Sequence, residues 1–180
     1  MQHRKGQDVN SRTLPGVTAA APPTAIMADA ADMALIMRLS GEAFGIPVRI
    51  VNEIIDPIHI TRVPNAPAFA PGLINVRGAV VPVLDLRHRL RMQPSEPQST
   101  ARIVVIETAL NGELVRLAIM ADAVEEVVEV DLGKLEPVPD LGAPWPDIYV
   151  LGVLRYAKGL VVVLNGDTLF RPEPVPTSLI

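Results

Sequence analysis

The chain has 180 residues, of which 49% are hydrophobic and 20% are charged, so it can bury a core and is not disordered as a whole. A net charge of −4 argues against general affinity for nucleic acid, and the absence of cysteine excludes disulfides, thiolate metal sites and cysteine nucleophiles. No apolar run approaches the roughly 18 to 20 residues that cross a bilayer, and no secretory signal follows the basic N-terminus, so we expect a cytoplasmic protein without membrane insertion.

The first part of the chain, residues 1–32, predicts a flexible tail. It combines Gly, Ser, Thr, Ala, Gln and Pro with few branched apolar residues, so it can bury little surface. From residue 33 onward the hydrophobic period shortens to that of strands, and the chain's 18 prolines leave little room for long helices. We therefore divide the chain into a tail over residues 1–32, one domain over residues 33–172 and a C-terminal tail over residues 173–180.

Four turn signals organise the domain into hairpins. Each contains a glycine, and Asn111-Gly112 is the clearest, because these two residue types accept the positive φ that a two-residue hairpin needs. The predicted strand pairs are residues 34–39 with 44–51, 73–76 with 79–84, 102–110 with 113–120, and 148–156 with 160–164. Four hairpins of short strands indicate an all-β fold, and periodicity alone does not distinguish barrels from a sandwich.

Two further segments are open to a helical interpretation. Residues 122–130 fit a helix turn and an acid-edged strand equally well, and we favour the strand. Residues 86–92 place arginines among leucine and methionine and stop just before a proline, which predicts a short helical turn. We interpret Arg87, Arg89 and Arg91 as a solvated helix face or the rim of a protein interface, because no aromatic residue interleaves them as a nucleic-acid site requires.

The search for catalytic and metal-binding chemistry is negative. The three histidines are His3, His59 and His88, and no two of them are spaced as a metal pair. Phosphate-binding glycine loops and the serine nucleophile elbow are absent from the sequence. Glu125 and Glu126 are adjacent, so on a strand they face opposite sides, and we interpret them as a solvated acidic edge. The sequence therefore predicts no catalytic residue, no metal site and no cofactor.

The most informative segment couples two apolar runs through a tight corner that ends at Gly78. Arg77 sits at that corner, where the planar fork of its guanidinium suits recognition of a partner surface better than proton transfer. The motif GLINVRGAVVPVLDLR, preceded by VNEI and ITRVPNAP, resembles the CheW family of chemotaxis coupling proteins. The resemblance covers residues 33–170, most of the chain.

The resemblance implies a fold of two interleaved β-barrels similar to SH3 domains, and a protein that is not an enzyme. Members of the family are adaptors that link the cytoplasmic tips of chemoreceptors to the regulatory domain of a CheA-type histidine kinase. Chemoreceptor and kinase are thus the implied partners, without nucleic acid, and the implied location is at chemoreceptor arrays on the inner face of the membrane. Two alternatives stay open: a scaffold of a twitching or other chemosensory pathway without kinase coupling, and a nucleic-acid-binding β-barrel.

The resemblance also implies the contact residues. The family's VxEI motif matches Val51 and Glu53, and its glycine and N-x-R-G corner match Gly72 and Arg77, so these four are expected to bind the receptor. Ile60 matches the region where the family docks on the kinase, and we expect that contact on the opposite barrel.

Three of these residues have structural alternatives. Gly72 could serve backbone geometry only, since glycine also permits close approach of two chain segments. Arg77 could be a structural brace that pairs with Glu53 or with Asp85. Ile60 lies in a proline-rich connection, where the sequence favours an exposed position and a core position about equally.

Overall fold

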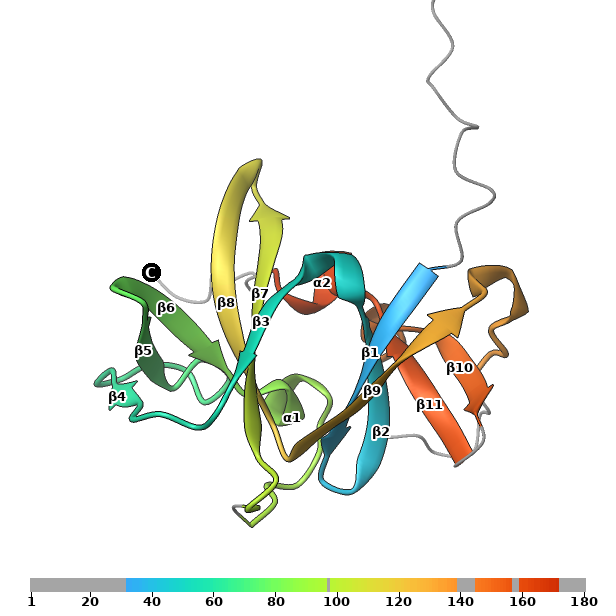
Figure 1. The fold of residues 1–180 in the computed structure, drawn as a ribbon, viewed down its shortest axis with the longest axis horizontal. Helices are drawn as coiled ribbons and strands as arrows, with labels where there is room; N and C mark the ends of the chain where they lie inside the picture. The colour runs from blue at the N-terminus through green and yellow to red at the C-terminus, as the bar shows by residue number, and fades with distance from the viewer. Residues whose placement is uncertain (1–31, 97, 139–144, 157–158, 172–180) are drawn as a thin grey trace, which may run out of the picture. The chain divides into compact units, whose positions relative to one another are not determined.

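The computed structural model describes residues 32–96, 98–138, 145–156 and 159–171 of the chain (Figure 1). The predicted N-terminal tail lies outside these residues except for its last position, and the predicted C-terminal tail lies outside them entirely. The described residues form two β-sheets joined by short helical segments, so the predicted all-β class is confirmed.

The five-stranded sheet has the strand order β10-β11-β2-β1-β9 and combines both ends of the domain. Its strands are β1 (Asp32–Leu39), β2 (Glu42–Pro47), β9 (Ala123–Val130), β10 (Val150–Tyr156) and β11 (Gly159–Leu164). Two antiparallel hairpins, β1–β2 and β10–β11, meet where β11 runs parallel to β2, with Val162 opposite Phe44. The sheet is therefore completed only after the last strands of the chain have been made.

The six-stranded sheet has the strand order β3-β7-β8-β6-β5-β4 and contains the middle of the chain. Its strands are β3 (Val51–Ile55), β4 (Thr61–Arg62), β5 (Gly72–Val76), β6 (Ala79–Leu84), β7 (Arg102–Leu110) and β8 (Glu113–Ala121). Here too one parallel pair joins the hairpins, because β6 lies beside β8 with Val83 opposite Ala118. The two sheets thus repeat the same plan, hairpins joined by a single parallel pair.

Three of the four predicted turns lie fully within the described residues, and all three are confirmed. Ser40, Arg77 and Asn111 have φ values of 50°, 52° and 53°, and each is followed by a glycine whose φ is also positive. Two consecutive positive φ values give the turn whose twist matches that of a hairpin. For the fourth, Lys158-Gly159, the first residue lies outside the described residues, while β10 and β11 pair as predicted.

The two barrels that the resemblance implies are not closed: each sheet is curled and keeps open edges. Strand pairing among the described residues leaves β3, β4, β9 and β10 as edges. Side chains nevertheless link an edge strand of each sheet to a distant part of the same sheet: Arg77 at the β5–β6 turn donates to Glu53 on β3, and Tyr156 on β10 donates to Glu126 on β9. Each curled sheet encloses its own cluster of buried aliphatic side chains.

A third apolar cluster lies between the sheets and takes side chains from both of them. Among its fully buried members are Phe44 and Ile46 from the five-stranded sheet and Ile119 from the six-stranded sheet. Other buried aliphatic side chains of the strands are Val81, Val83, Val104, Ile106, Val162 and Leu164. Because few aromatic residues are available, the core is filled with interdigitating aliphatic chains.

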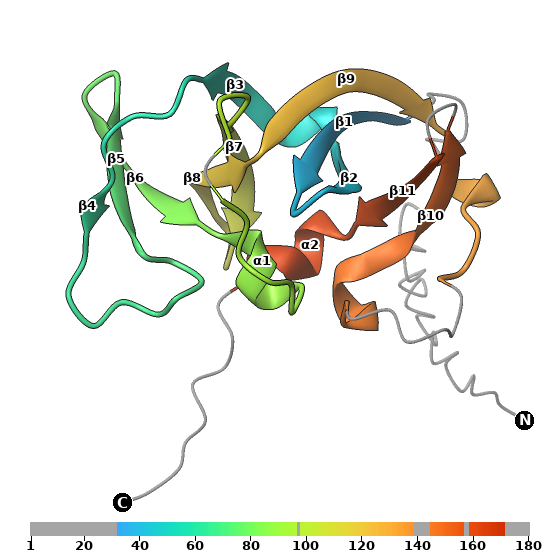
Figure 2. The same cartoon turned by 90° about the horizontal axis from the view of Figure 1, so that it is seen from below.

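Two connections lie between the sheets. Asp122 carries the chain from β8 in one sheet to β9 in the other, and the segment that was open to a helical interpretation is a strand from Ala123 onward. The short helices α1 (Leu86–Arg89) and α2 (Gly166–Leu169) both lie between the two sheets (Figure 1 and Figure 2), and α1 confirms the predicted helical turn. Three 3-10 segments complete the described fold: η1 (Val48–Ile50), η2 (Leu132–Lys134) and η3 (Asp147–Tyr149).

Candidate functional site

Arg77 occupies the first position of the β5–β6 turn. The side-chain oxygen of Asn75 accepts a hydrogen bond from the backbone N–H of Gly78 at 2.8 Å, which holds the turn closed. The Arg77 side chain is 82% exposed, and its Nη2 donates to Glu53 Oε2 at 3.0 Å. Of the two braces that the sequence left open, the structure contains the one to Glu53, whereas Asp85 pairs with an arginine of α1.

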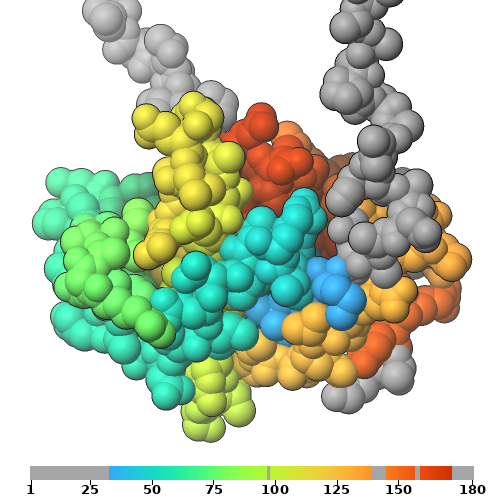
Figure 3. Space-filling view, turned by 45° about the horizontal axis from the view of Figure 1, so that its top comes forward, coloured from blue at the N-terminus to red at the C-terminus, as the bar shows by residue number. Residues whose placement is uncertain are grey.

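Val51 and Glu53 lie on β3, at one edge of the six-stranded sheet. Val51 is half-buried against the inter-sheet cluster, and the Glu53 side chain is 21% exposed. A β-bulge separates the two residues, since Val51 lies opposite Ile106 and Glu53 lies opposite Val105. Bulges re-aim the side chains of the strand that carries them, and here the result places Glu53 within reach of the β5–β6 turn. Figure 3 shows β3 (cyan) beside the hairpins β5–β6 (green) and β7–β8 (yellow) on one face of the domain.

Gly72 begins β5 and is buried where β4 pairs with it. A Cβ atom built on this residue would lie 2.4 Å from the carbonyl oxygen of Thr61 and 2.8 Å from Cγ2 of Ile60. Real Cβ atoms do not approach backbone oxygens so closely, so only glycine fits without a shift of β4. The structure therefore gives Gly72 a backbone role, one of the two roles that the sequence left open.

Ile60 is half-buried immediately before β4 and packs on the aliphatic cluster inside the six-stranded sheet. It also lines a cavity of about 210 Å³ together with Ile58, Met120 and the charged residues Asp85 and Arg87. Ile58 is 40% exposed, so the connection before β4 presents apolar surface on both sides of His59. Between the exposed and core alternatives, Ile60 is intermediate.

The structure brings four of the five predicted contact residues into two pairs. Glu53 contacts Arg77, and Gly72 lies against Ile60, while Val51 stands next to the first pair on β3. All five belong to the six-stranded sheet or to the connection that enters it. The expectation that Ile60 lies on the opposite barrel is therefore wrong, because residues 56–60 are a short connection that leads directly into β4 beside β5.

The arginines of α1 do not form a solvated face or an interface rim. Arg87 is 6% exposed and Arg89 is 4% exposed, whereas Arg91, beyond the helix, is exposed. The guanidinium of Arg89 lies 3.8 Å above the ring centre of Phe69 and 5.6 Å from that of Tyr149. Sequence reasoning missed these aromatic partners because they lie far from α1 along the chain. The readable signal was Asp85, a helix-capping residue followed two positions later by a basic one.

The two adjacent glutamates lie on β9, an edge strand of the five-stranded sheet, where Glu125 is exposed as predicted and Glu126 is half-buried; each is paired with a side chain of another strand. Arg38 on β1 pairs with Glu125 at 2.9 Å, and the hydroxyl of Tyr156 donates to Glu126 at 2.7 Å. The second bond stabilises the neutral phenol, and it raises the pKa of Tyr156. The two carboxylates point to different partners, as adjacent strand residues must.

The described residues contain no group of three or more His, Asp or Glu side chains that could hold a metal ion. His59 and His88 are both exposed, and neither belongs to such a group. Within the same part of the chain, no helix is long and apolar enough to cross a membrane.

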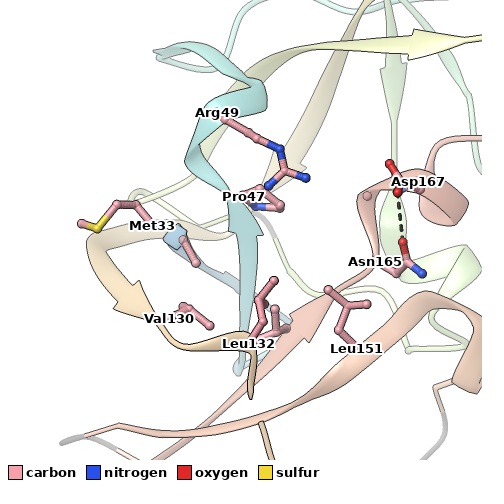
Figure 4. Close-up of a pocket in the computed structure, with 11 residues that line it drawn as sticks. Met33, Pro47, Arg49, Val130, Leu132, Leu151, Asn165 and Asp167 are labelled. Atoms are coloured by element: carbon pink, nitrogen blue, oxygen red, sulfur yellow. Dashed lines mark hydrogen bonds between the residues drawn. The ribbon is translucent and has the colours of Figure 1, made fainter. Parts of the chain in front are cut away.

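A separate pocket of about 280 Å³ opens at one end of the five-stranded sheet (Figure 4). Its apolar wall includes Met33, Leu132 and Leu151, which are 44%, 49% and 47% exposed. At its polar end the side-chain oxygen of Asn165 accepts from the backbone N–H of Asp167 at 3.1 Å, so it is committed to capping α2. The predicted contact residues do not line this pocket, and its lining contains no nucleophile with an adjacent base.

A family model and proteins of known sequence match most of this chain. Residues 33–173 match the family model of the CheW-like domain. The chain is 31% identical over 139 residues to the chemotaxis protein CheW of Rhizobium meliloti (strain 1021), an alignment that covers 77% of this chain and 87% of that protein. It is also 31% identical over 136 residues to the probable chemotaxis protein CheW of Rhizobium etli, with coverage of 76% and 85%.

A solved structure extends the similarity to the fold. The scaffolding protein TtCheW from Thermoanaerobacter tengcongensis superimposes with a TM-score of 0.67 at 25% sequence identity, over 84% of this chain and 93% of that one.

Proposed function

Because the chain belongs to the CheW-like domain family, we propose that it is a non-catalytic chemotaxis scaffold that couples chemoreceptors to a CheA-type histidine kinase. The observation that carries the proposal is the family match over residues 33–173, which includes every predicted contact residue. We place the protein in the cytoplasm at chemoreceptor arrays, with no cofactor, no nucleic acid and no membrane insertion of its own.

The receptor contact is assigned to Val51, Glu53, Gly72 and Arg77. The Arg77 side chain is 82% exposed, and its hydrogen bond to Glu53 orients it. Because a guanidinium has five N–H donors, this bond leaves others for a partner. Val51 adds apolar surface on the neighbouring strand. Gly72 contributes indirectly, since it allows β4 to pack against the strand that leads to Arg77.

The kinase contact is assigned to Ile60 and the apolar connection around it. Ile58 and Val63 are each 40% exposed on either side of Ile60, and prolines fix the path of this connection. An apolar patch on a rigid loop suits docking against an apolar end of a partner domain.

Receptor and kinase would thus both bind to the six-stranded sheet, and the sheet would fix their positions relative to each other. A scaffold of this kind can transmit a signal only if its partners bind differently in their two states. The protein would supply geometry, and its partners would supply the change of state.

The test is calorimetric titration of the protein with the regulatory domain of a histidine kinase from its own organism. We expect micromolar binding that Ile60→Asp abolishes. Leu114→Asp is the matched control, because Leu114 lies on the same sheet and is 69% exposed at the β7–β8 hairpin. Since Ile60 is half-buried, circular dichroism must show that Ile60→Asp remains folded, and Ile60→Ala offers a milder change.

Absence of binding to each kinase of the organism at millimolar concentration would overturn the coupling. Retained binding to receptor fragments in that case would identify a scaffold without kinase coupling, as in a different chemosensory pathway.

A further inference from the structure

We propose that α1 is a rigid joint that fixes the angle between the two sheets, through Arg87 bound to Asp122 and Arg89 bound to the end of α2. This role belongs to the domain itself and does not depend on which partners the protein binds. The inter-sheet joint consists of the contacts that Arg87 and Arg89, which follow β6 of the six-stranded sheet, make with Asp122 and with α2, which follows β11 of the five-stranded sheet.

The first half of the joint centres on Asp122, the residue at which the chain passes from one sheet to the other. Arg87 Nη2 donates to Asp122 Oδ1 at 2.5 Å, and Arg87 Nη1 donates to Asp85 Oδ1 at 2.9 Å. The side chains of Arg87 and Asp122 are 7% and 13% exposed, so this is a buried ion pair. Arg87 follows β6 of the six-stranded sheet, so its fork ties α1 to the crossover into the five-stranded sheet.

Asp122 collects donors from three separate segments. Besides Arg87, the backbone N–H of Ser40 donates to Oδ2 at 2.6 Å, and the hydroxyl of Ser95 donates to Oδ1 at 2.7 Å. Ser40 belongs to the β1–β2 turn of the five-stranded sheet, and Ser95 to the connection between α1 and β7. Movement of any one segment would take a hydrogen-bond donor away from the buried carboxylate, which costs free energy. Asp122 therefore holds all three segments in fixed positions relative to one another.

The second half of the joint lies two residues further along α1. Arg89 Nη1 donates to the backbone carbonyl of Leu169 at the end of α2, and the carbonyl of Thr168 lies 3.4 Å from the same nitrogen. The guanidinium also stacks on Phe69, from the loop before β5. Cations favour the carbonyl end of a helix, and Arg89 thereby connects α2 to the six-stranded sheet.

These directional contacts do something that the inter-sheet core does not. The aliphatic cluster between the sheets holds them together, but the hydrophobic effect is non-directional, so it does not by itself specify one angle between the sheets. Hydrogen bonds and ion pairs in a buried site specify one geometry, a role that buried polar groups can fill even where they add little stability. Removal of the joint should therefore leave the domain folded while the angle between its sheets becomes variable.

The absence of cysteine makes the experiment direct. Cysteines introduced as Val80→Cys on β6 and Leu160→Cys on β11 place spin labels on the two sheets at positions 68% and 54% exposed. A control label pair, Ile54→Cys with Val80→Cys, stays within the six-stranded sheet. Pulsed dipolar spectroscopy then gives the label-to-label distance distribution for the full chain. The joint is opened by Arg87→Met, and Arg116→Met removes a half-exposed arginine that pairs with Glu107 inside one sheet.

We expect Arg87→Met to broaden and shift the distribution between the sheets while the control pair keeps its narrow distribution, and Arg116→Met to change neither. An unchanged distribution between the sheets in folded Arg87→Met would overturn the proposal. If Arg87→Met does not fold, Asp122→Asn replaces it, because one carboxylate oxygen then becomes an amide that cannot accept. Loss of folding in both variants would also overturn the proposal, since it would make these residues part of a single indivisible core.

Discussion

Arginines in two neighbouring regions of the chain have opposite environments. At the β5–β6 turn, Arg77 is 82% exposed and pairs with the carboxylate of Glu53. In α1, ten and twelve positions later, Arg87 and Arg89 are almost fully buried and bound to groups from distant parts of the chain. The same residue type thus presents a charge to solvent in one region and joins two sheets in the other.

This contrast shows that burial of an arginine depends on how many acceptors the fold can bring to it. A guanidinium leaves water without a large free-energy penalty only when acceptors or aromatic faces replace the lost hydration. The crossover at Asp122 and the end of α2 supply such groups around α1, whereas the tight turn brings Glu53 to Arg77. Arginines that the fold leaves exposed remain available for partners.

The greatest loss of stability should follow from removal of a buried arginine. Arg87→Ala strips Asp122 of its cation and leaves a buried carboxylate, which for buried pairs costs about 3 to 5 kcal/mol of unfolding free energy. Urea unfolding followed by circular dichroism measures the loss. Arg116→Ala is the control, because that arginine is 50% exposed in its pair with Glu107 and should change stability by less than about 1 kcal/mol. Equal losses in the two variants would erase the proposed distinction between buried and exposed arginines.

Substitution of Gly72 in β5, the strand that leads to Arg77, should lower the stability of the fold more than substitution of Arg77 itself. Gly72→Ala puts a methyl group 2.4 Å from the Thr61 carbonyl oxygen, and such overpacking typically costs about 1 to 3 kcal/mol. Gly166→Ala is a matched control, since the nearest atom to its new methyl lies at 3.7 Å. Thermal unfolding compares the two variants. A Gly72→Ala protein as stable as the parent would show that β4 can shift away from the new methyl group without loss of stability.

The exposed arginine should matter for binding and little for folding. Arg77→Ala should weaken receptor binding by about 1 to 3 kcal/mol, as for other charged interface anchors, and change stability by no more than about 0.5 kcal/mol. Titration with a receptor cytoplasmic fragment and parallel urea unfolding measure both quantities. Arg62→Ala, another exposed arginine of the same sheet, controls for general charge. Unchanged affinity together with lost stability would reassign Arg77 to a structural brace.

Much of the fold was readable from the sequence because its signals are local. Turn glycines after Ser40, Arg77 and Asn111 indicated three hairpins, and the short hydrophobic period indicated strands from residue 33 onward. Motif similarity then supplied the five predicted contact residues, whose roles in binding stay a prediction. For Arg77, the expected corner position and one of its two expected braces are both present.

The remaining features depend on contacts between residues far apart in the chain. The burial of Arg87 requires Asp122, and the stacking of Arg89 requires Phe69 and the last turn of α2. From its sequence alone, a four-residue helix with several basic side chains is predicted to be exposed to solvent, because its acceptors and aromatic partners come from other parts of the chain. The half-buried state of Ile60 likewise follows from its packing beside Gly72, which only the pairing of β4 with β5 reveals.

An exposed arginine in the five-stranded sheet should have the weakest influence on stability. Arg155 on β10 donates to Glu136 at 2.6 Å, and this hydrogen bond lowers the pKa of Glu136 below its ordinary value of 4.5. A carboxyl whose pKa is lower in the folded chain than in the unfolded chain stabilises the fold above the unfolded value, and that stabilisation is lost as pH falls through the folded value. Both side chains are well exposed, at 75% and 49%, so the contribution is small and salt should screen it.

Comparison of the parent with Glu136→Gln over pH measures this contribution. The parent should be slightly more stable above pH 4.5, and the difference should close as the solution is acidified below that value. High salt should reduce the difference at neutral pH. A difference that persists unchanged in acid or in high salt would mean that the Glu136 side chain does not act through its charge, because Glu136→Gln leaves the backbone hydrogen bonds to Val153 in place.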